Sequence, residues 1–195
     1  VTIWWYEDGQ VQEIRGARGT YEIGADAQSL PYWQFNLTGL YSRPENAPTV
    51  QGVESTIAGE VPINKQNSTF TLFGYPARLQ AFSQNAGNQV EYRNLVGYEG
   101  VHITDRRVTG NITIEAPALA DFNAFEKVES HQLVTLGEVT LTHGTAPGNI
   151  IKAEGLQAQA ANITPNDNQG IIHYGMEIRY LPTGSNDDDV KYVFT

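Results

Sequence analysis

The chain has 195 residues, 12 Lys plus Arg against 22 Asp plus Glu, and no cysteine. Without cysteine there is no disulfide framework, thiolate zinc site, iron–sulfur cluster or cysteine nucleophile. A formal charge of −10 argues against a protein that binds nucleic acid through the phosphates, because phosphate binding requires clustered Lys and Arg.

Segments in which apolar and polar residues alternate predict β-strands along most of the chain. In chain order these segments are 1–6, 10–15, 20–24, 33–38, 68–74, 77–83, 98–104, 108–115, 132–142, 149–159, 173–180 and 190–195. Turn sequences such as Glu7-Asp8-Gly9 and Ala86-Gly87-Asn88 separate them. The connections are too short for helical crossovers, so an antiparallel, mainly β fold is expected.

The alternation also predicts which side chains face the core. Trp33, Phe35 and Leu37 share one face of segment 33–38, and the residues between them are polar. Because successive side chains of a strand point to opposite faces, we expect these three apolar side chains on the core side. Segment 173–180 shows the same pattern and is expected to be a half-buried strand.

One segment, 117–129, has helical rather than strand periodicity. Its apolar residues recur every three or four positions, at Ala118, Leu119, Phe122 and Phe125. Pro117 suits the first position of a helix, and Asp121 lies early while Lys127 lies late. We expect a single amphipathic helix that packs against the sheet.

Two segments, 42–60 and 184–189, are predicted to be long loops. The first contains Pro44 and Pro48, and long loops in compact domains are commonly functional or disordered. The second contains Asp187-Asp188-Asp189, which lacks the alternation, the internal Gly and the distal Glu of a calcium-binding loop. We interpret this run as a solvated acidic turn.

A single domain over residues 1–195 is expected, because a chain of this length can bury one hydrophobic core and no linker composition divides it. The first residue, Val1, already lies in a predicted strand, which leaves open a preceding N-terminal segment. The longest uninterrupted apolar run, 3–6, is far shorter than the roughly 20 residues that span a bilayer. No membrane partner is therefore expected.

No catalytic, cofactor-binding or metal-binding residues are predicted, and no cofactor is expected. The nucleophile motif Gly-x-Ser-x-Gly and the phosphate-binding loop spacing are absent. The histidines are spaced too far apart for a paired metal motif, and we interpret them as strand-surface residues. They are His102, His131, His143 and His173.

Two further clusters have ordinary structural interpretations. Gly16-Ala17-Arg18-Gly19 lacks the strand-to-helix context of a dinucleotide fingerprint and is expected to be a turn or bulge. Asp105-Arg106-Arg107 could bind a phosphate, but a local ion pair that fixes a turn is the favoured interpretation.

The tryptophans raise the possibility of a carbohydrate-binding surface, because sugars stack on flat aromatic rings. Trp4 and Trp5 are adjacent on one predicted strand and point to opposite faces, so we expect at most one to be exposed. Trp33 is expected on the core side.

Several segments in order resemble the tail tube, or major tail, proteins of long-tailed bacteriophages. They are 15–21, 31–41, 63–65, 70–72, 103–106, 110–115 and 118–122. The most specific is the run Phe35-Asn36-Leu37-Thr38-Gly39-Leu40-Tyr41 followed by Pro44. The resemblance covers about residues 10–129, and the final third of the chain matches only in being rich in strands.

The resemblance implies an antiparallel β-sandwich or barrel with one flanking helix. It further implies a structural virion protein rather than an enzyme, with copies that form hexameric rings. The rings stack into a tail tube around a tape-measure protein, with a tail terminator as a second assembly partner. Assembly would occur in the host cytoplasm, and the genome would later pass through the tube without specific binding.

In such a tube the acidic charge acquires a role. A cationic channel would bind duplex DNA and slow it, whereas polar and acidic side chains on the wet faces of strands would repel it weakly. Only side chains near the channel matter, since the screening length is about 8 Å at physiological salt. We further expect segment 42–60 to be an arm that contacts neighbouring copies.

Three other functions remain open from the sequence alone. One is a β-sandwich carbohydrate-binding module that uses exposed tryptophans. Another is a different virion part, such as a tail terminator or a capsid decoration protein, because these share small β-rich folds. The third is a glycosidase that uses two of the acids, for which carboxylate spacing gives no support.

Overall fold

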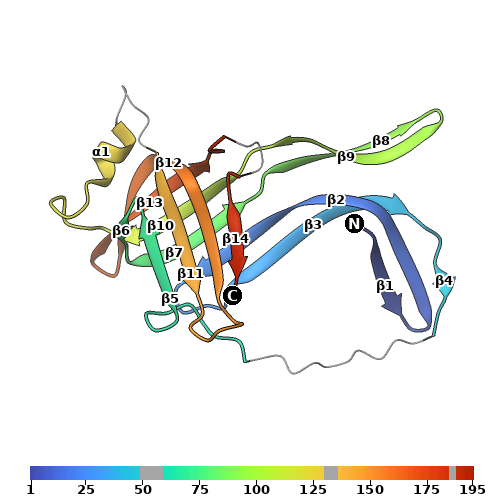
Figure 1. Ribbon diagram of the computed structural model, residues 1–195, viewed down its shortest axis with the longest axis horizontal. Coiled ribbons are helices and arrows are strands. Elements are labelled where there is room, and N and C mark those ends of the chain that lie inside the picture. Colours follow the sequence, from blue (N-terminus) through green and yellow to red (C-terminus); the bar gives the residue numbers. More distant parts are fainter. Residues whose placement is uncertain (49–58, 130–135, 185–187) are drawn as a thin grey trace. The chain divides into compact units, whose positions relative to one another are not determined.

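The computed structural model describes residues 1–48, 59–129, 136–184 and 188–195, and it is mainly antiparallel β-structure with one short helix (Figure 1). The chain divides into two compact units. Unit 1 comprises Val1–Tyr21, Gln34–Gly59 and Ala86–Arg106. Unit 2 comprises Glu22–Trp33, Glu60–Asn85 and Arg107–Thr195.

Unit 2 is built around one antiparallel sheet that folds over a single core. Its strands are β5 (Ser68–Leu72), β6 (Tyr75–Pro76), β7 (Leu79–Asn85), β10 (Thr109–Glu115), β11 (Gly137–His143), β12 (Ile151–Asn168), β13 (Ile171–Tyr180) and β14 (Lys191–Phe194). They follow the order β7-β10-β13-β12-β11-β5-β6, and β14 pairs with β12. The last residues of β2 (Gln10–Asp26) pair with β7.

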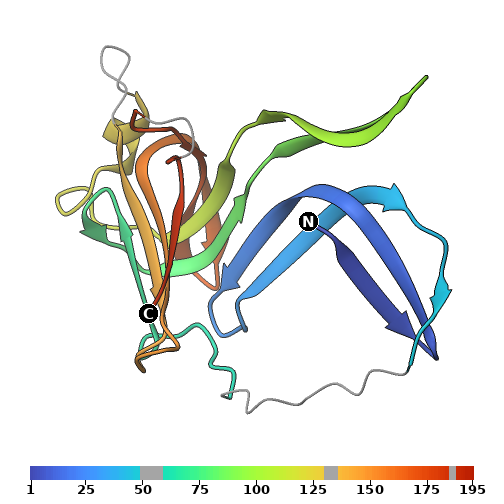
Figure 2. The same ribbon diagram turned by 45° about the vertical axis from the view of Figure 1, so that its right-hand side comes forward.

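The long strand β12 joins the two layers of this sandwich. Its first half pairs with β11 and its second half with β13, and the register shifts between Ala161 and Thr164. Figure 2 shows the bend of this strand, drawn in orange. Phe70 of β5 and Phe82 of β7 come from opposite ends of the strand order, yet their rings meet at 6.1 Å. The sheet therefore closes on itself as a β-sandwich, as expected.

The core of unit 2 follows the predicted alternation. Ile112 and Ile114 of β10 are buried, as are Met176, Ile178 and Tyr180 of β13, while Glu177 and Arg179 are exposed. Segment 173–180 is therefore a half-buried strand, as predicted.

The flanking helix is shorter than predicted. Helix α1 (Ala124–Glu129) starts seven residues after Pro117, because the Asn123 side chain accepts a hydrogen bond from the Glu126 amide at 3.2 Å and caps the helix. The preceding residues form a turn in which the Phe122 amide donates to the Ala118 carbonyl at 3.1 Å.

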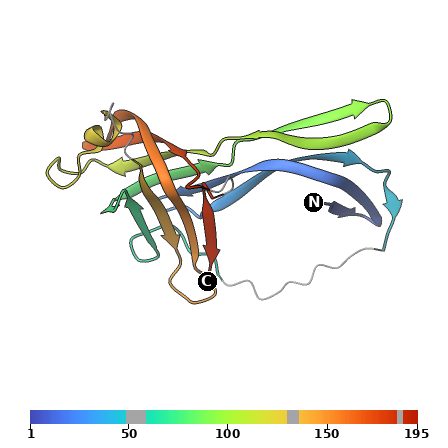
Figure 3. The same ribbon diagram turned by 45° about the horizontal axis from the view of Figure 1, so that its top comes forward.

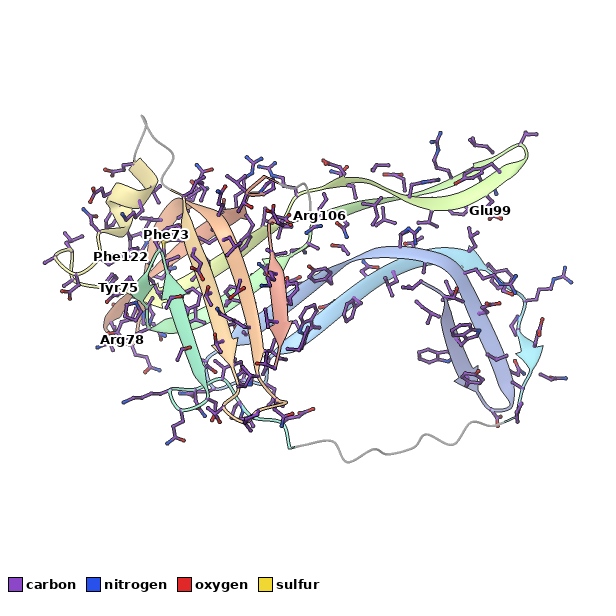
Figure 4. All side chains as sticks on the ribbon, in the orientation of Figure 1. Phe73, Tyr75, Arg78, Glu99, Arg106 and Phe122 are labelled. Carbon is purple, nitrogen blue, oxygen red and sulfur yellow. The ribbon has the colours of Figure 1, made fainter. Side chains whose placement is uncertain are left out.

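The helix region nevertheless packs against the sheet. Phe122 stacks on Tyr75 of β6 at 5.0 Å, and Phe125 meets Tyr174 of β13 edge to face at 5.3 Å. Figure 4 shows Phe122 and Tyr75 side by side, next to Phe73. Aromatic contacts thus fix this segment before and within the helix.

Several strands differ from their predicted bounds. β2 is one continuous strand where the sequence predicts two, and the segment Gly16-Ala17-Arg18-Gly19 lies inside it, with Gly16 at a φ of +59°. β8 (Asn88–Leu95) is absent from the sequence prediction because its residues are mostly polar. β12 extends past residue 159 to Asn168. The beginning of predicted strand 132–142 lies outside the described residues.

A buried hydroxyl without a hydrogen-bond partner lies in the core of unit 2. The Tyr180 side chain is 4% exposed, and its hydroxyl has no partner within the described chain. The Oε1 atom of buried Gln84 instead accepts a hydrogen bond from the Tyr192 hydroxyl at 2.6 Å. Burial raises the pKa of Tyr180, because the phenolate cannot be solvated there, and the nearby Gln84 side chain offsets only a smaller part of this shift.

We expect Tyr180→Phe to raise the free energy of unfolding at pH 7 by about 1 kcal/mol, because the variant no longer buries an unsatisfied polar group. The wild-type hydroxyl stays protonated in the folded chain, whereas the unfolded chain ionises near pH 10. The part of the free energy of unfolding that depends on this raised pKa is therefore fully present below pH 10. It is lost as the pH rises from 10 towards the pKa of the folded chain. The variant should lose less stability than wild type in this alkaline range.

Urea unfolding at pH 7 and pH 11 measures both effects. Tyr41→Phe is the matched control, because Tyr41 is 73% exposed and should change neither value. A Tyr180→Phe chain that is less stable at pH 7 and equally sensitive to alkali would contradict this account of the core.

Candidate functional site

Unit 1 is made mainly of strands whose side chains are largely exposed. They are β1 (Ile3–Glu7), the first part of β2, most of β3 (Tyr32–Tyr41), β4 (Glu45–Asn46), β8 and β9 (Tyr98–Arg106). β1, β3 and β4 all pair with β2, whereas β8 and β9 form a two-stranded sheet of their own. Figure 3 shows the β8–β9 hairpin as a two-stranded ribbon, drawn in green.

The β8–β9 ribbon leaves the outer edge of each strand without a strand partner among the described residues. A two-stranded ribbon alone in water is at best marginally stable, and open edges are templates for pairing with another chain. The turn of the ribbon is also apolar, with Leu95 at 54% exposure and Val96 fully exposed. These properties are typical of a segment that a neighbouring molecule completes.

The two faces of this ribbon differ in polarity, because cross-strand partners share a face. We call the side with Val90, Tyr92, Val101 and Ile103 the apolar face of the ribbon. The other side, its polar face, carries Gln89, Glu91, Arg93, His102 and Asp105. The ribbon is therefore amphipathic, and the described residues cover neither its two outer edges nor the whole of its apolar face.

Hydrogen bonds organise both faces near the turn. On the apolar side the Tyr92 hydroxyl donates to Glu99 Oε1 at 2.5 Å, which raises the pKa of Tyr92. On the polar side the Tyr98 ring stacks on His102 at 5.8 Å and the two side chains share a hydrogen bond. Figure 4 places Glu99 near the turn.

β3 corrects the prediction that Phe35 and Leu37 face the core beside Trp33. Trp33 is half-buried against Tyr192 at 4.8 Å, but Phe35 and Leu37 are 60% and 43% exposed. The Phe35 ring contacts Tyr21 at 6.3 Å without being covered. The alternation identified an apolar face correctly, but the described residues do not bury the part of that face that lies in unit 1.

Both tryptophans of β1 are exposed, which corrects the prediction of at most one. Trp4 is 57% and Trp5 63% exposed. They do point to opposite faces, because they are neighbours on one strand, and each of those faces is open. The prediction failed because it assumed that one side of β1 packs on a core.

The β2–β3 pair is held in close contact by a glycine. A Cβ atom on Gly19 would lie 2.2 Å from the Asn36 carbonyl oxygen, so no other residue fits without moving β3. Gly19 therefore serves strand packing, whereas Gly16 has open space beside it and adopts a positive φ of +59° inside β2.

The remaining polar candidates take structural roles. His143 hydrogen-bonds the Ser68 hydroxyl at 2.8 Å, and His173 lies 3.1 Å from the Ile171 carbonyl. His131 lies outside the described residues. Within the described part of the chain, no group of three or more His, Asp or Glu side chains could hold a metal ion.

Two charged segments lie in a structural environment that differs from the predicted one. Asp105 and Arg106 lie inside β9 rather than in a turn, and Asp105 accepts a hydrogen bond from the Arg106 amide at 2.8 Å. In the 187–189 run, Asp188 accepts a hydrogen bond from the Thr183 amide and Asp189 is 7% exposed, so Asp189 is not solvated. Asp187 lies outside the described residues.

The described residues combine a β-sandwich with strands whose apolar faces stay exposed, a pattern typical of proteins that assemble through contacts between copies. The sequence model of the phage tail tube protein family matches residues 1–191, and the chain belongs to that family. No curated protein matches the chain at a significant level. None of the described helices is long and apolar enough to cross a membrane.

Proposed function

We propose that copies of this chain form hexameric rings that stack into the phage tail tube, and that the tube is the conduit through which the genome passes during ejection. The observation that carries this proposal is the β8–β9 ribbon. Its open edges and partly exposed apolar face have no complement within one described copy, and sister copies would supply both.

We infer that strand pairing between copies makes a continuous wall, with the polar face of the ribbon towards the channel. That face carries two acids and one arginine, so it is weakly negative when His102 is neutral. The exposed polar residues of β3, Gln34, Asn36 and Thr38, add uncharged groups. Such a wall presents few cations to passing DNA and therefore does not bind its phosphates. The genome would move through the channel without specific binding.

The other parts of the proposal follow from the tail tube assignment. The whole chain would act as one tail-tube domain, since the family match runs through both compact units. A tape-measure protein would occupy the channel before the genome, a tail terminator would cap the finished tube, and assembly would take place in the host cytoplasm. The protein would be a structural component of the tail and would catalyse no reaction.

Sedimentation velocity over a range of protein concentrations tests the stoichiometry. We expect a monomer at low concentration, and at higher concentration a six-copy species followed by much larger particles. A monomer that persists at every concentration, or a closed species with a different number of copies, would contradict the proposal.

A further inference from the structure

Unit 2 has a polar cleft on the solvent face of its sheet, between β10, β13 and β12. The cleft has a volume of about 390 Å³. Strand pairing aligns one row of side chains across it, formed by Thr109, Arg179 and Gln159. The next row consists of Asn111, Glu177 and Ala161. The small Ala161 and the adjacent shift in the β12 register leave space above this part of the sheet.

The cleft is basic on a chain that is strongly acidic. Arg107 and Arg179 are both exposed, and neither guanidinium forms an ion pair or hydrogen bond with any residue of the described ranges. The single carboxylate of the cleft, Glu177, accepts a hydrogen bond from the Asn162 amide at 2.9 Å. Two guanidiniums and one carboxylate give the cleft a net positive charge, whereas the chain as a whole carries −10.

These groups fit a carboxylate on a peptide better than a phosphate chain. A guanidinium binds a carboxylate through two parallel hydrogen bonds. The hydroxyl of Thr109 and the amides of Asn111 and Gln159 can pair with a peptide backbone. Glu177 would repel a densely charged polyanion such as DNA, so the cleft favours a short acidic peptide segment.

Unit 1 presents such a segment in the turn between β1 and β2. Glu7 and Asp8 are exposed, and Asp8 and Gly9 both have positive φ, at 40° and 78°, as in a tight hairpin turn. β4 pairs with the same end of β2 and adds Glu45 across from Val11. Among the described residues no cation pairs with any of these three carboxylates, so the turn is acidic and uncompensated.

We propose that the cleft of one copy binds the Glu7-Asp8 turn of a neighbouring copy. This inference rests on the proposed assembly and adds to it a defined contact. The two surfaces differ, so the contact is head to tail, and contacts of this kind generate rings or stacks rather than closed pairs. Charge complementarity selects the acidic turn as the occupant and sets the register between copies.

Because the chain has no cysteine, engineered cysteines report this contact without background. An Asp8→Cys chain is mixed with a Thr109→Cys chain, assembled, and oxidised mildly. We expect a disulfide-linked dimer in the mixture. The control mixture uses Lys65→Cys, an exposed residue of unit 2 outside the cleft, in place of Thr109→Cys and should give no such dimer.

The outcomes separate the two proposals. Assembled species without the Asp8–Thr109 crosslink would overturn this inference and leave the tube proposal standing. A wild-type chain that never assembles would overturn both. The crosslink in the mixture, with none in the Lys65 control, would establish the contact.

Charge reversal gives a second, independent test. Arg107→Glu with Arg179→Glu should raise the protein concentration needed for assembly by about tenfold or more, because like charges then face each other. Adding Glu7→Lys and Asp8→Lys to that chain should restore assembly. The matched control, Lys65→Glu, should assemble as wild type. No recovery in the fourfold variant, with circular dichroism showing folded protein, would contradict the contact.

Discussion

Replacing Phe35 and Leu37 with serine should abolish tube assembly at ordinary protein concentrations and leave the subunit folded. Phe35 is 60% and Leu37 43% exposed in the described chain, and both lie outside the core of unit 2, so we expect the subunit to fold without them. Burial of a side chain of this size contributes about 1.5–3 kcal/mol, so loss of both raises the concentration needed for assembly by about a hundredfold or more.

The control for this variant lies on the same strand. Gln34→Ser with Asn36→Ser changes the opposite, polar face of β3 and should assemble as wild type. Electron microscopy counts the particles, and circular dichroism confirms the fold. Normal tubes from the Phe35 and Leu37 variant would show that assembly does not cover this face.

Lysines on the polar face of the β8–β9 ribbon should convert a passive channel into one that binds DNA. Glu91→Lys with Asp105→Lys changes the charge of that face by +4 in every copy and makes it cationic. Phosphate contacts of this kind strengthen binding at low salt and weaken steeply as salt rises from about 50 to 200 mM. We expect tubes of the variant to retain short duplex DNA at low salt and release it at high salt.

The matched control places the same charge change in unit 2. Glu126→Lys with Glu129→Lys alters two exposed acids of α1 and tests whether any added lysines would bind DNA. Co-sedimentation of duplex DNA with washed tubes measures both variants. Equal retention by the two would contradict the assignment of the ribbon's polar face to the channel.

The sequence predicted the type of fold well, because strand alternation depends on local side-chain chemistry. Met176, Ile178 and Tyr180 are buried as their spacing indicates. The helix was predicted too long because apolar spacing continues back to Ala118, whereas the Asn123 cap fixes the first turn. β8 was missed because its polar residues carry little periodic signal, and its pairing with β9 defines it.

The candidate site was harder to predict, because alternation shows that a face is apolar but not what covers it. The alternation places Phe35 and Leu37 in a core inside the subunit, and it predicts that at most one of Trp4 and Trp5, which point to opposite faces, is exposed. The exposure of all four side chains shows that the apolar content of unit 1 exceeds what one copy buries. The motifs that indicated a tail tube protein cover residues 10–129, and the family match extends this to 1–191.

The most direct test of the central claim is an electron cryomicroscopy map of the protein assembled at high concentration. The account predicts stacked rings with six copies each, in which β8–β9 ribbons of neighbouring copies lie in one continuous wall and Gln89, Glu91 and Arg93 point into the channel. A map in which these ribbons lie outside the wall, or in which their edges stay unpaired in the assembled particle, would contradict it.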